Sequence, residues 1–305
     1  MHVLVTGGAG YIGTEVVKKL AEQSKITSVT VYDNLSRHNY NLFLQCEGLN
    51  RKLRFVHGDI LDSRKLKNCL NAIDIVIHLA AKVTTPFSHL DSHMYEQVNN
   101  WGTAELTYAV EKSDVKQLIF MSSTSVYGSR PLPFCEADEP NPNGYYAISK
   151  YRAEAHINRL SDKIRTHIIR CGNVYGYGNS IRFDAVVNKM LFDAKFSKAV
   201  SIHGSGDQFR SFIHVSVVAQ VINQLILLQN NPQSGTYNLA TDNLCINDIV
   251  NVLSALKPEL EHIRINKHVK MIGQQIVLPC KLLEYLPFSY HSFERNLADL
   301  YLKFA

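Results

Sequence analysis

The residues best suited to chemistry in this chain are a tyrosine and a lysine four positions apart. Tyr146 and Lys150 share one face of a predicted helix, because side chains at i and i+4 are neighbours there. A free phenol has a pKa of about 10, too high for a base at neutral pH. A nearby ammonium favours the phenolate, so the pair predicts a general base that accepts a proton from a hydroxyl group.

A cluster of hydroxyl side chains precedes this pair. The apolar run 117–122 is predicted as a strand, and it leads into the sequence SSTSVYG at 122–128. Such residues can simply form turns. Because they follow a strand, we expect Ser122, Ser123 and Thr124 at the carboxyl edge of a parallel sheet, where the ligands of such sheets bind.

The first 33 residues have the pattern of a dinucleotide-binding unit. An apolar run leads through Thr6 into GGAGYIG, a helical pattern follows, and a second apolar run ends at Asp33. Glycines there allow a tight turn and let the backbone approach a pyrophosphate at the helix N-terminus. Asp33 is placed to accept hydrogen bonds from a ribose diol, so the segment predicts a bound dinucleotide.

The Asp33 carboxylate also favours NAD over NADP, because it would repel a 2′-phosphate. Arg37 is the nearby cation that could weaken this preference. Its simpler interpretation is a solvated loop charge.

Strand and helix patterns alternate through residues 1–175. Strands are predicted at 2–6, 28–33, 53–57, 74–80, 117–122 and 165–171, with helices near 11–23, 62–71, 92–112 and 144–160. The alternation predicts an α/β fold, a Rossmann-type doubly wound parallel sheet that binds NAD and carries the catalytic residues.

After residue 175 the elements become shorter. Strands are predicted at 200–203, 236–239 and 262–266, with helices near 183–194, 215–229, 246–256 and 292–302. We therefore expect residues 176–305 to form mainly a smaller C-terminal α/β substrate-binding lobe, whose chain can cross back into the first domain. A ligand cleft between the two parts is the expected consequence.

The composition is that of an ordinary soluble enzyme. The 305 residues are 46% hydrophobic and 19% charged, with a net charge of +5. Lysines and arginines are scattered, which argues against nucleic acid, and no apolar run approaches the roughly 18 residues of a membrane span. The six cysteines show neither CxxC pairing nor metal-ligand spacing, so no metal is expected. A cytoplasmic location fits these features and the strand pattern at the start of the chain.

Taken in order, these segments resemble an extended short-chain dehydrogenase/reductase of the NAD-dependent nucleotide-sugar epimerase/dehydratase family. The resemblance runs through nearly the whole chain. Besides the glycine turn, the serine cluster and the Tyr146/Lys150 pair, it rests on 33–36, 58–59, 78–81, Asn99 with 102–103, 173–176 and 204–215.

The resemblance implies roles for particular residues. Ser123 would be the catalytic hydroxyl, Tyr146 the base and Lys150 its electrostatic partner. The expected cofactor contacts are Gly7, Gly10, Tyr11, Ile12, Gly13, Asp33, Asn34, Leu35, Ser36, Asp59, Ile60, Leu79, Ala80, Ala81, Lys82, Asn99, Ser122, Tyr146 and Lys150.

The expected substrate contacts are Thr84, Ser123, Thr124, Asn173, Arg182 and Arg210. Arg210 matches the family arginine that pairs with the nucleotide diphosphate, and Asn173 matches the family asparagine near the sugar phosphate. Arg182 lies in a loop that departs from the galactose-type epimerases. It is either a second phosphate ligand or a plain surface arginine.

Departures from the family pattern narrow the reaction. Dehydratases of this family carry Asp-Glu directly after the catalytic hydroxyl, whereas this chain has Thr124 and Ser125. Neither hydroxyl can protonate a leaving group near neutral pH. The sequence therefore favours an NAD-dependent nucleotide-diphosphate-sugar epimerase that oxidises and re-reduces C4 through a 4-keto intermediate.

Two alternatives remain at this point. One is an NAD-dependent nucleotide-sugar or nucleotide-heptose dehydrogenase with net oxidation, and the other is an NAD-sensing protein without catalysis. The nucleotide and the sugar stay open.

A homodimer is also expected. Related enzymes pair two helices per subunit, and two-fold dimers are the commonest oligomers. The predicted helices 92–112 and 144–160 carry apolar residues beyond one core stripe, among them Trp101, Leu106, Ala109 and Val110 on the first. The expected partners are thus a nucleotide-diphosphate sugar and a second copy of the chain, with no nucleic acid and no membrane.

Overall fold

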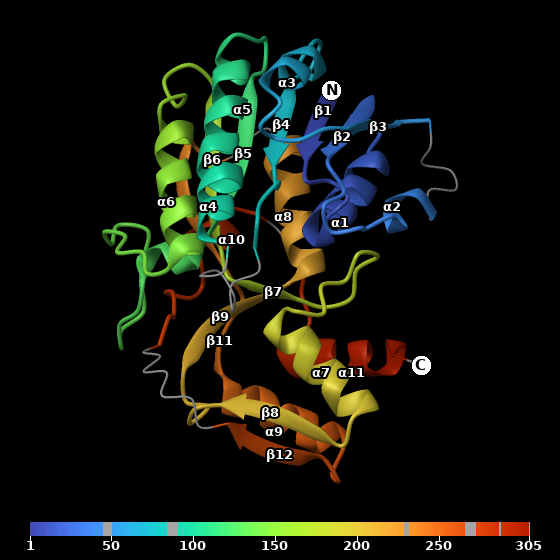
Figure 1. The fold of residues 1–305 in the computed structure, drawn as a ribbon, viewed down its shortest axis with the longest axis vertical. Helices are drawn as coiled ribbons and strands as arrows, with labels where there is room; N and C mark the ends of the chain where they lie inside the picture. The colour runs from blue at the N-terminus through green and yellow to red at the C-terminus, as the bar shows by residue number, and fades with distance from the viewer. Residues whose placement is uncertain (45–50, 84–90, 229–231, 266–272, 287, 305) are drawn as a thin grey trace.

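The largest element of the protein is a parallel sheet of seven strands (Figure 1). The computed structural model describes residues 1–44, 51–83, 91–228, 232–265, 273–286 and 288–304. In sheet order the strands are β10 (Gly235–Leu239), β6 (Arg165–Cys171), β5 (Gln117–Ser123), β4 (Ile75–His78), β1 (His2–Thr6), β2 (Ser28–Asp33) and β3 (Leu53–His57). The order changes direction between β1 and β4, the switch point where such sheets bind ligands.

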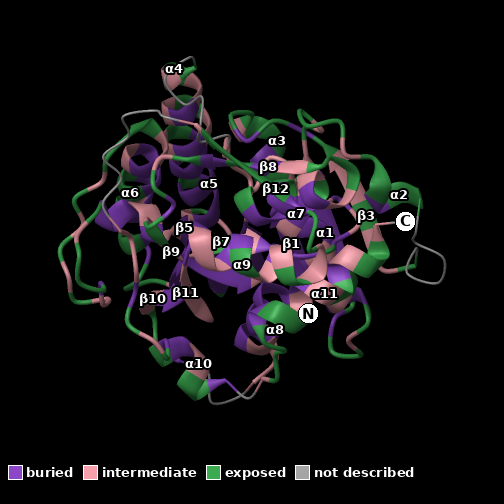
Figure 2. Ribbon diagram, turned by 90° about the horizontal axis from the view of Figure 1, so that it is seen from below, coloured by how far each residue is buried: buried purple, intermediate pink, exposed green. Residues whose placement is uncertain are grey.

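The strands are apolar because the sheet is covered on both faces. Val3, Leu4 and Val5 of β1 have no exposed surface, and Figure 2 shows the central strands among the buried residues. One face packs against α1 (Tyr11–Ala21) and α8 (Val215–Leu227). The other is covered by α3 (Ser63–Cys69), α5 (Gly102–Glu111) and α6 (Tyr145–Asn158). The predicted Rossmann-type fold is confirmed.

The prediction of one continuous helix at 92–112 is wrong in detail, because the structure has three helical segments there. A short α4 (Ser92–Tyr95) runs into a π-helical stretch, η2 (Glu96–Trp101), before α5 begins. Asn99 lies in this wider stretch and is buried. A π-bulge shifts the register of a helix and is frequent at functional sites.

The predicted apolar excess on this helix is also wrong for three residues. Leu106, Ala109 and Val110 are buried against the sheet and belong to its core. Trp101 is 60% exposed, so it alone of the four faces away from the core.

The lower lobe in Figure 1 is built around two small sheets. One joins β11 (Asp242–Cys245), β9 (Phe209–His214) and β7 (Asn173–Tyr175), and the other joins β12 (Glu261–Ile265) to β8 (Ala199–His203). Their core is shared with α7 (Val186–Phe196), α9 (Ile246–Leu256) and α11 (Phe293–Lys303). The sequence missed β7, β11 and the short helices α2 (Asn41–Leu44) and α10 (Lys281–Tyr285), which are too short for a clear period. It also missed β9, whose six residues FRSFIH do not form a continuous apolar run.

The chain returns to the large sheet after building part of this lobe. Strand β10 pairs with β6, and α8 packs beside α1. The two parts therefore interleave along the sequence, and a single boundary at residue 175 does not separate them.

The glycine turn between β1 and α1 depends on a close backbone approach. Gly7 has a φ of +72°, and a Cβ added there would lie 2.5 Å from the backbone nitrogen of Ala80. At Gly13 an added Cβ would lie 2.3 Å from the carbonyl oxygen of Gly7. Only glycine fits these two positions. Without side chains there, the backbone of the turn can approach a ligand closely.

We predict that Gly7→Ala lowers the free energy of unfolding by at least about 2 kcal/mol more than Gly204→Ala does. Gly204 is the matched control, since its φ of +74° is nearly the same and nothing lies within 4 Å of an added Cβ. Urea unfolding measures both losses. Equal losses would mean that the contact with Ala80 is unimportant.

Candidate active site

The three predicted catalytic residues meet at the carboxyl end of β5. Ser123 is the last residue of that strand, and Tyr146 and Lys150 lie one turn apart on α6 beside it. The Lys150 Nζ donates to the carbonyl of Met121 at 2.8 Å and lies 4.8 Å from the centre of the Phe120 ring. The Ser123 Oγ accepts from the hydroxyl of Ser125 at 2.9 Å.

The electrostatics of this group are set by burial. Burial raises the pKa of the Tyr146 phenol, while the Arg182 guanidinium and a hydrogen bond with Ser123 lower it. Burial lowers the pKa of Lys150 to about 7, and the Glu154 carboxylate acts against that change. Burial thus moves the pKa of the lysine towards neutral pH and the pKa of the tyrosine away from it, and the charge of Arg182 and the bond with Ser123 offset part of the change at the tyrosine.

Asn99 connects the π-helical stretch to the turn after β4. Its Oδ1 accepts from the Lys82 backbone nitrogen at 2.8 Å, and its Nδ2 donates to the Lys82 carbonyl at 3.1 Å and the Ser149 hydroxyl at 2.9 Å. Lys82 also forms an ion pair with Asp91 at 3.4 Å. These contacts fix the 79–82 segment beside the glycine turn.

A buried histidine supports the same corner. The Nδ1 of His78 lies 2.7 Å from the Thr6 hydroxyl, and its Nε2 lies 2.9 Å from the Thr103 hydroxyl. Burial lowers the pKa of His78 to about 3, so the ring is neutral. It joins β1, β4 and α5 as a polar core residue.

The predicted adenosine side of the cofactor site is formed by the ends of β2 and β3. The Asp33 carboxylate accepts from the backbone nitrogens of Ala9 and Leu35 at 3.0 and 2.8 Å. Asn34 donates to Asp59 at 2.9 Å, and Ile60 is buried against Gly102. With the glycine turn open and an acid at the strand end, these residues fit a dinucleotide.

The remaining predicted cofactor residues divide into two groups. The first group lies on the glycine turn, in the first turn of α1 and on the segments that follow β2 and β4: Gly7, Gly10, Ile12, Gly13, Ser36, Leu79, Ala80 and Ala81. Tyr11 and Ser122 have hydroxyls already engaged within the protein: Tyr11 donates to the Gly176 carbonyl at 2.5 Å, and Ser122 donates to Glu154 at 2.6 Å.

Arg182 reaches from the segment after β7 towards the catalytic group. It donates to Asp184 at 3.0 Å and to the Val83 carbonyl at 3.2 Å. Asp184 also pairs with Arg37 at 3.0 Å, so Arg37 is exposed but ion-paired. Tyr95 packs edge-on against Tyr146 with ring centres 6.3 Å apart.

Two of the other predicted substrate residues lie on a small sheet of the lower lobe. Asn173 on β7 donates to the Ser211 carbonyl at 3.2 Å, and Arg210 lies on the neighbouring strand β9. Thr124 is buried and follows Ser123 directly. Thr84 lies outside the described residues. Burial lowers the pKa of the Arg210 guanidinium, which fits a cation in a recess.

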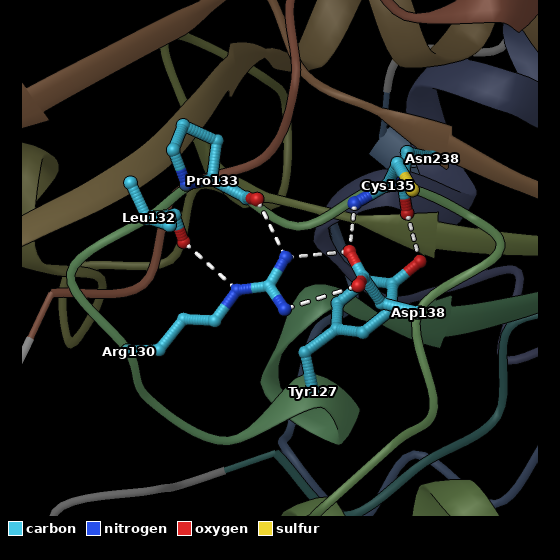
Figure 3. A network of polar contacts seen from close by, with 7 residues as sticks. All are labelled: Tyr127, Arg130, Leu132, Pro133, Cys135, Asp138 and Asn238. Atoms are coloured by element: carbon cyan, nitrogen blue, oxygen red, sulfur yellow. Dashed lines mark hydrogen bonds and ion pairs between the residues drawn. The ribbon is translucent and has the colours of Figure 1, made fainter.

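The loop after the hydroxyl cluster is held by its own ion pair (Figure 3). Arg130 donates to both carboxylate oxygens of Asp138 at 3.0 and 2.6 Å, and Asp138 also accepts from the Cys135 backbone nitrogen at 2.7 Å. Tyr127 donates to Asn238 of β10 at 2.8 Å. These contacts fix the 127–138 loop over the end of the sheet.

Comparison with known proteins decides the family. The model of the NAD-dependent epimerase/dehydratase family matches residues 3–240. The chain belongs to this family. Its membership confirms the predicted resemblance, an enzymatic activity and NAD as the cofactor.

Curated relatives of this epimerase/dehydratase include two kinds of enzyme. A protein of Methanocaldococcus jannaschii named putative UDP-glucose 4-epimerase is 35% identical over 227 residues, which cover 72% of this chain and 71% of the relative. The mouse dTDP-D-glucose 4,6-dehydratase is 30% identical over 246 residues, which cover 79% of this chain and 68% of the relative.

A solved structure extends the likeness to the whole fold. The UDP-glucuronic acid 4-epimerase of Bacillus cereus, in complex with UDP-glucuronic acid and NAD, is 25% identical with a TM-score of 0.86. The match covers 99% of this chain and 98% of that chain. None of the described helices of this family member is both long and apolar enough to cross a membrane.

Some residues of this epimerase/dehydratase site were not predicted from the sequence. Glu154 stands four positions after Lys150, so the same helical spacing that identified Tyr146 and Lys150 could have included it. Tyr95 and Asp184 had no comparable signal, because Tyr146 and Arg37, which they contact, lie in distant segments. His78 begins the 78–81 segment that carries the resemblance, but its bonds to Thr6 and Thr103 could not be read from the sequence.

Proposed function

We propose that this enzyme is a nucleotide-diphosphate-sugar epimerase that oxidises and re-reduces its substrate at C4. The observation that carries the proposal is the meeting of Ser123, Tyr146 and Lys150 at the carboxyl end of β5, with hydroxyls at 124 and 125 in place of an acid pair. The named 4-epimerases among its relatives support the same reaction.

In this proposal Tyr146 removes the proton from the C4 hydroxyl as general base. Ser123 donates a hydrogen bond to the same oxygen, and the Lys150 ammonium favours the phenolate. NAD, when bound, supplies the acceptor and then the donor of the hydride. The 4-keto sugar rotates so that it receives the hydride on its other face, and Tyr146 returns the proton to the C4 oxygen.

The cofactor is assigned to the carboxyl ends of the strands of the large sheet. The glycine turn would hold the pyrophosphate, and Asp33 with Asn34 and Asp59 would hold the adenosine ribose and adenine side. The carboxylate of Asp33 favours NAD over NADP, since Arg37 is ion-paired to Asp184.

The substrate is assigned to the space between the sheet and the lower lobe. Arg210 would pair with the diphosphate through a bidentate guanidinium, with Asn173 on the neighbouring strand. Arg182 and Thr124 lie on the side of the catalytic group and would face the sugar. Thr84 stays a further proposed contact.

Two other reactions of this family would give different products. A dehydratase needs a carboxylic acid to protonate the leaving hydroxyl, and Thr124 and Ser125 cannot supply it. A net dehydrogenase needs no such acid. It would release NADH, whereas an epimerase regenerates its own NAD.

We predict that the enzyme converts one of a panel of UDP-, GDP-, dTDP- and CDP-sugars to its C4 epimer. Chromatography of the products identifies the epimer, and NADH absorbance should not accumulate.

Tyr146→Phe should lower turnover by about 100-fold or more, because it removes only the ionisable oxygen, while leaving NAD affinity nearly unchanged. NADH accumulating in step with substrate loss would identify a dehydrogenase, and a dehydrated product a dehydratase.

The role of Arg210 is tested separately. Arg210→Ala should weaken substrate binding by about 2–4 kcal/mol, seen mainly as a higher KM, and Arg210→Lys should recover part of it. Arg264→Ala is the control, an exposed arginine of the same lobe whose side chain bonds the Ser205 carbonyl. Equal affinity of wild type and Arg210→Ala for all four nucleoside diphosphates would exclude a diphosphate role.

We also propose that two copies of the chain pair through the helices on the outside of the sheet. Large aromatic side chains are exposed there: Trp101 is 60%, Tyr108 47% and Tyr151 39% exposed, and Figure 1 shows α5 and α6 side by side. An isologous dimer would bury the same patch on both copies.

Light scattering should therefore give twice the chain mass at micromolar concentration, and Trp101→Ser should shift the protein towards monomer. Leu132→Ser is the control, since Leu132 is 70% exposed in the loop after the serine cluster. A monomer mass for the wild type would refute the dimer.

A further inference from the structure

A buried ion pair lies directly behind the catalytic group. Glu154 is one turn beyond Lys150 on α6, and Arg170 lies on β6. The side chains of Arg170 and Glu154 are 7% and 3% exposed, and the Nη2 of Arg170 donates to Oε2 of Glu154 at 2.7 Å. The mechanism proposed above uses neither residue.

The Glu154 carboxylate is fully hydrogen-bonded and joins three elements. Its Oε1 accepts from the Ser122 hydroxyl of β5 at 2.6 Å and from the Arg170 Nε at 3.1 Å. The Arg170 guanidinium lies 4.7 Å from the centre of the Tyr127 ring. The pair therefore connects α6 to the strand whose end carries Ser123.

Stability alone is a weak reason for such a pair. The desolvation of two buried charges offsets much of their attraction, and well-packed apolar residues often replace a buried pair at no loss. A charge retained in the core next to a catalytic group suggests an electrostatic role instead.

Lys150 is the group on which that charge acts. Its Nζ donates to the carbonyl of Met121, the residue next to Ser122, so Glu154 and Lys150 are held by consecutive residues of β5. Burial lowers the pKa of Lys150, the Glu154 charge opposes this change, and the resulting pKa is about 7. A lysine with that pKa is only partly protonated at neutral pH, so the nearby carboxylate decides how much ammonium is present.

We propose that Glu154, fixed by Ser122 and Arg170, is a positioning residue that keeps Lys150 protonated beside Tyr146. The proposal rests on the function assigned above to Tyr146 and Lys150. Other titratable or charged groups also lie around Tyr146 and Lys150. They are His78 of β4, which is neutral, Tyr95 of α4, Arg170 and Cys171 of β6, and Arg182 of the segment after β7.

The test measures ionisation of Tyr146 rather than turnover. The ultraviolet tyrosinate absorbance of the full chain with NAD is titrated with pH, and the Tyr146→Phe curve is subtracted to isolate Tyr146. The same difference is then taken in a Glu154→Gln background. The amide keeps the shape of the carboxylate but loses its charge, so Lys150 should be less protonated. Tyr146 should then ionise at a pH higher by about half a unit or more.

Two further variants separate charge from folding. Glu154→Gln combined with Arg170→Met removes both buried charges, so it should fold where the single variant is unstable, and it should keep the shift of Tyr146. Glu111→Gln is the matched control. Its carboxylate pairs with Arg159 and Lys163 on the surface, and its loss should leave the titration of Tyr146 unchanged.

A Tyr146 titration identical in wild type and both Glu154 variants would overturn the proposal. A shift in Glu154→Gln that disappears in the double variant would also overturn it, because the pair would then act only through folding. Since no sugar substrate is needed, a wrong choice of reaction leaves this outcome readable. If the epimerase reaction is confirmed and the titration of Tyr146 does not change, only the role proposed for Glu154 is refuted.

Discussion

The contact of α6 with the carboxyl end of β5 is the interaction on which the site depends. Tyr146, Lys150 and Glu154 follow one another at four-residue spacing, so they lie along one face of the helix. On the strand, Met121, Ser122 and Ser123 follow one another directly, and each has a partner on that face. Three consecutive strand residues thus fix three consecutive helical turns. A change in the helix register by one residue would separate all three partners at once, which explains why the buried pair of Glu154 and Arg170 matters to the catalytic group in front of it.

Much of the large domain could be predicted from sequence because its signals are local. The strand at 165–171 and the first three strands were placed at their observed bounds, since buried parallel strands read as continuous apolar runs. The grouping of Ser123, Tyr146 and Lys150 followed from a spacing and from a strand end. Their identity as a site depended on the resemblance to a family as well as on the residues themselves.

The errors have equally physical causes. Leu106, Ala109 and Val110 were expected on a dimer face, but a helix that covers a sheet and also packs against α3 and α6 buries more than one stripe. The π-helical stretch around Asn99 has no signature in hydrophobic period, because it depends on bonds to Lys82 and Ser149 from distant segments. Strand β11 is short and β9 is interrupted by polar residues, and the two strands pair with each other.

The segment after β7 shows how the lower lobe constrains the cofactor side. Its backbone is held by α1, since Tyr11 bonds the Gly176 carbonyl and Glu15 accepts from the Asn179 nitrogen at 3.0 Å. Further along, Asp184 binds Arg37 of the segment after β2 and Arg182, whose charge acts on Tyr146. One carboxylate therefore fixes a cation at the adenosine end of the proposed NAD site and another near the catalytic phenol. Because both cations share Asp184, movement of this segment would alter the cofactor side and the electrostatics of Tyr146 together. The two ends of the site are thus mechanically and electrostatically linked through a loop that departs from the family pattern.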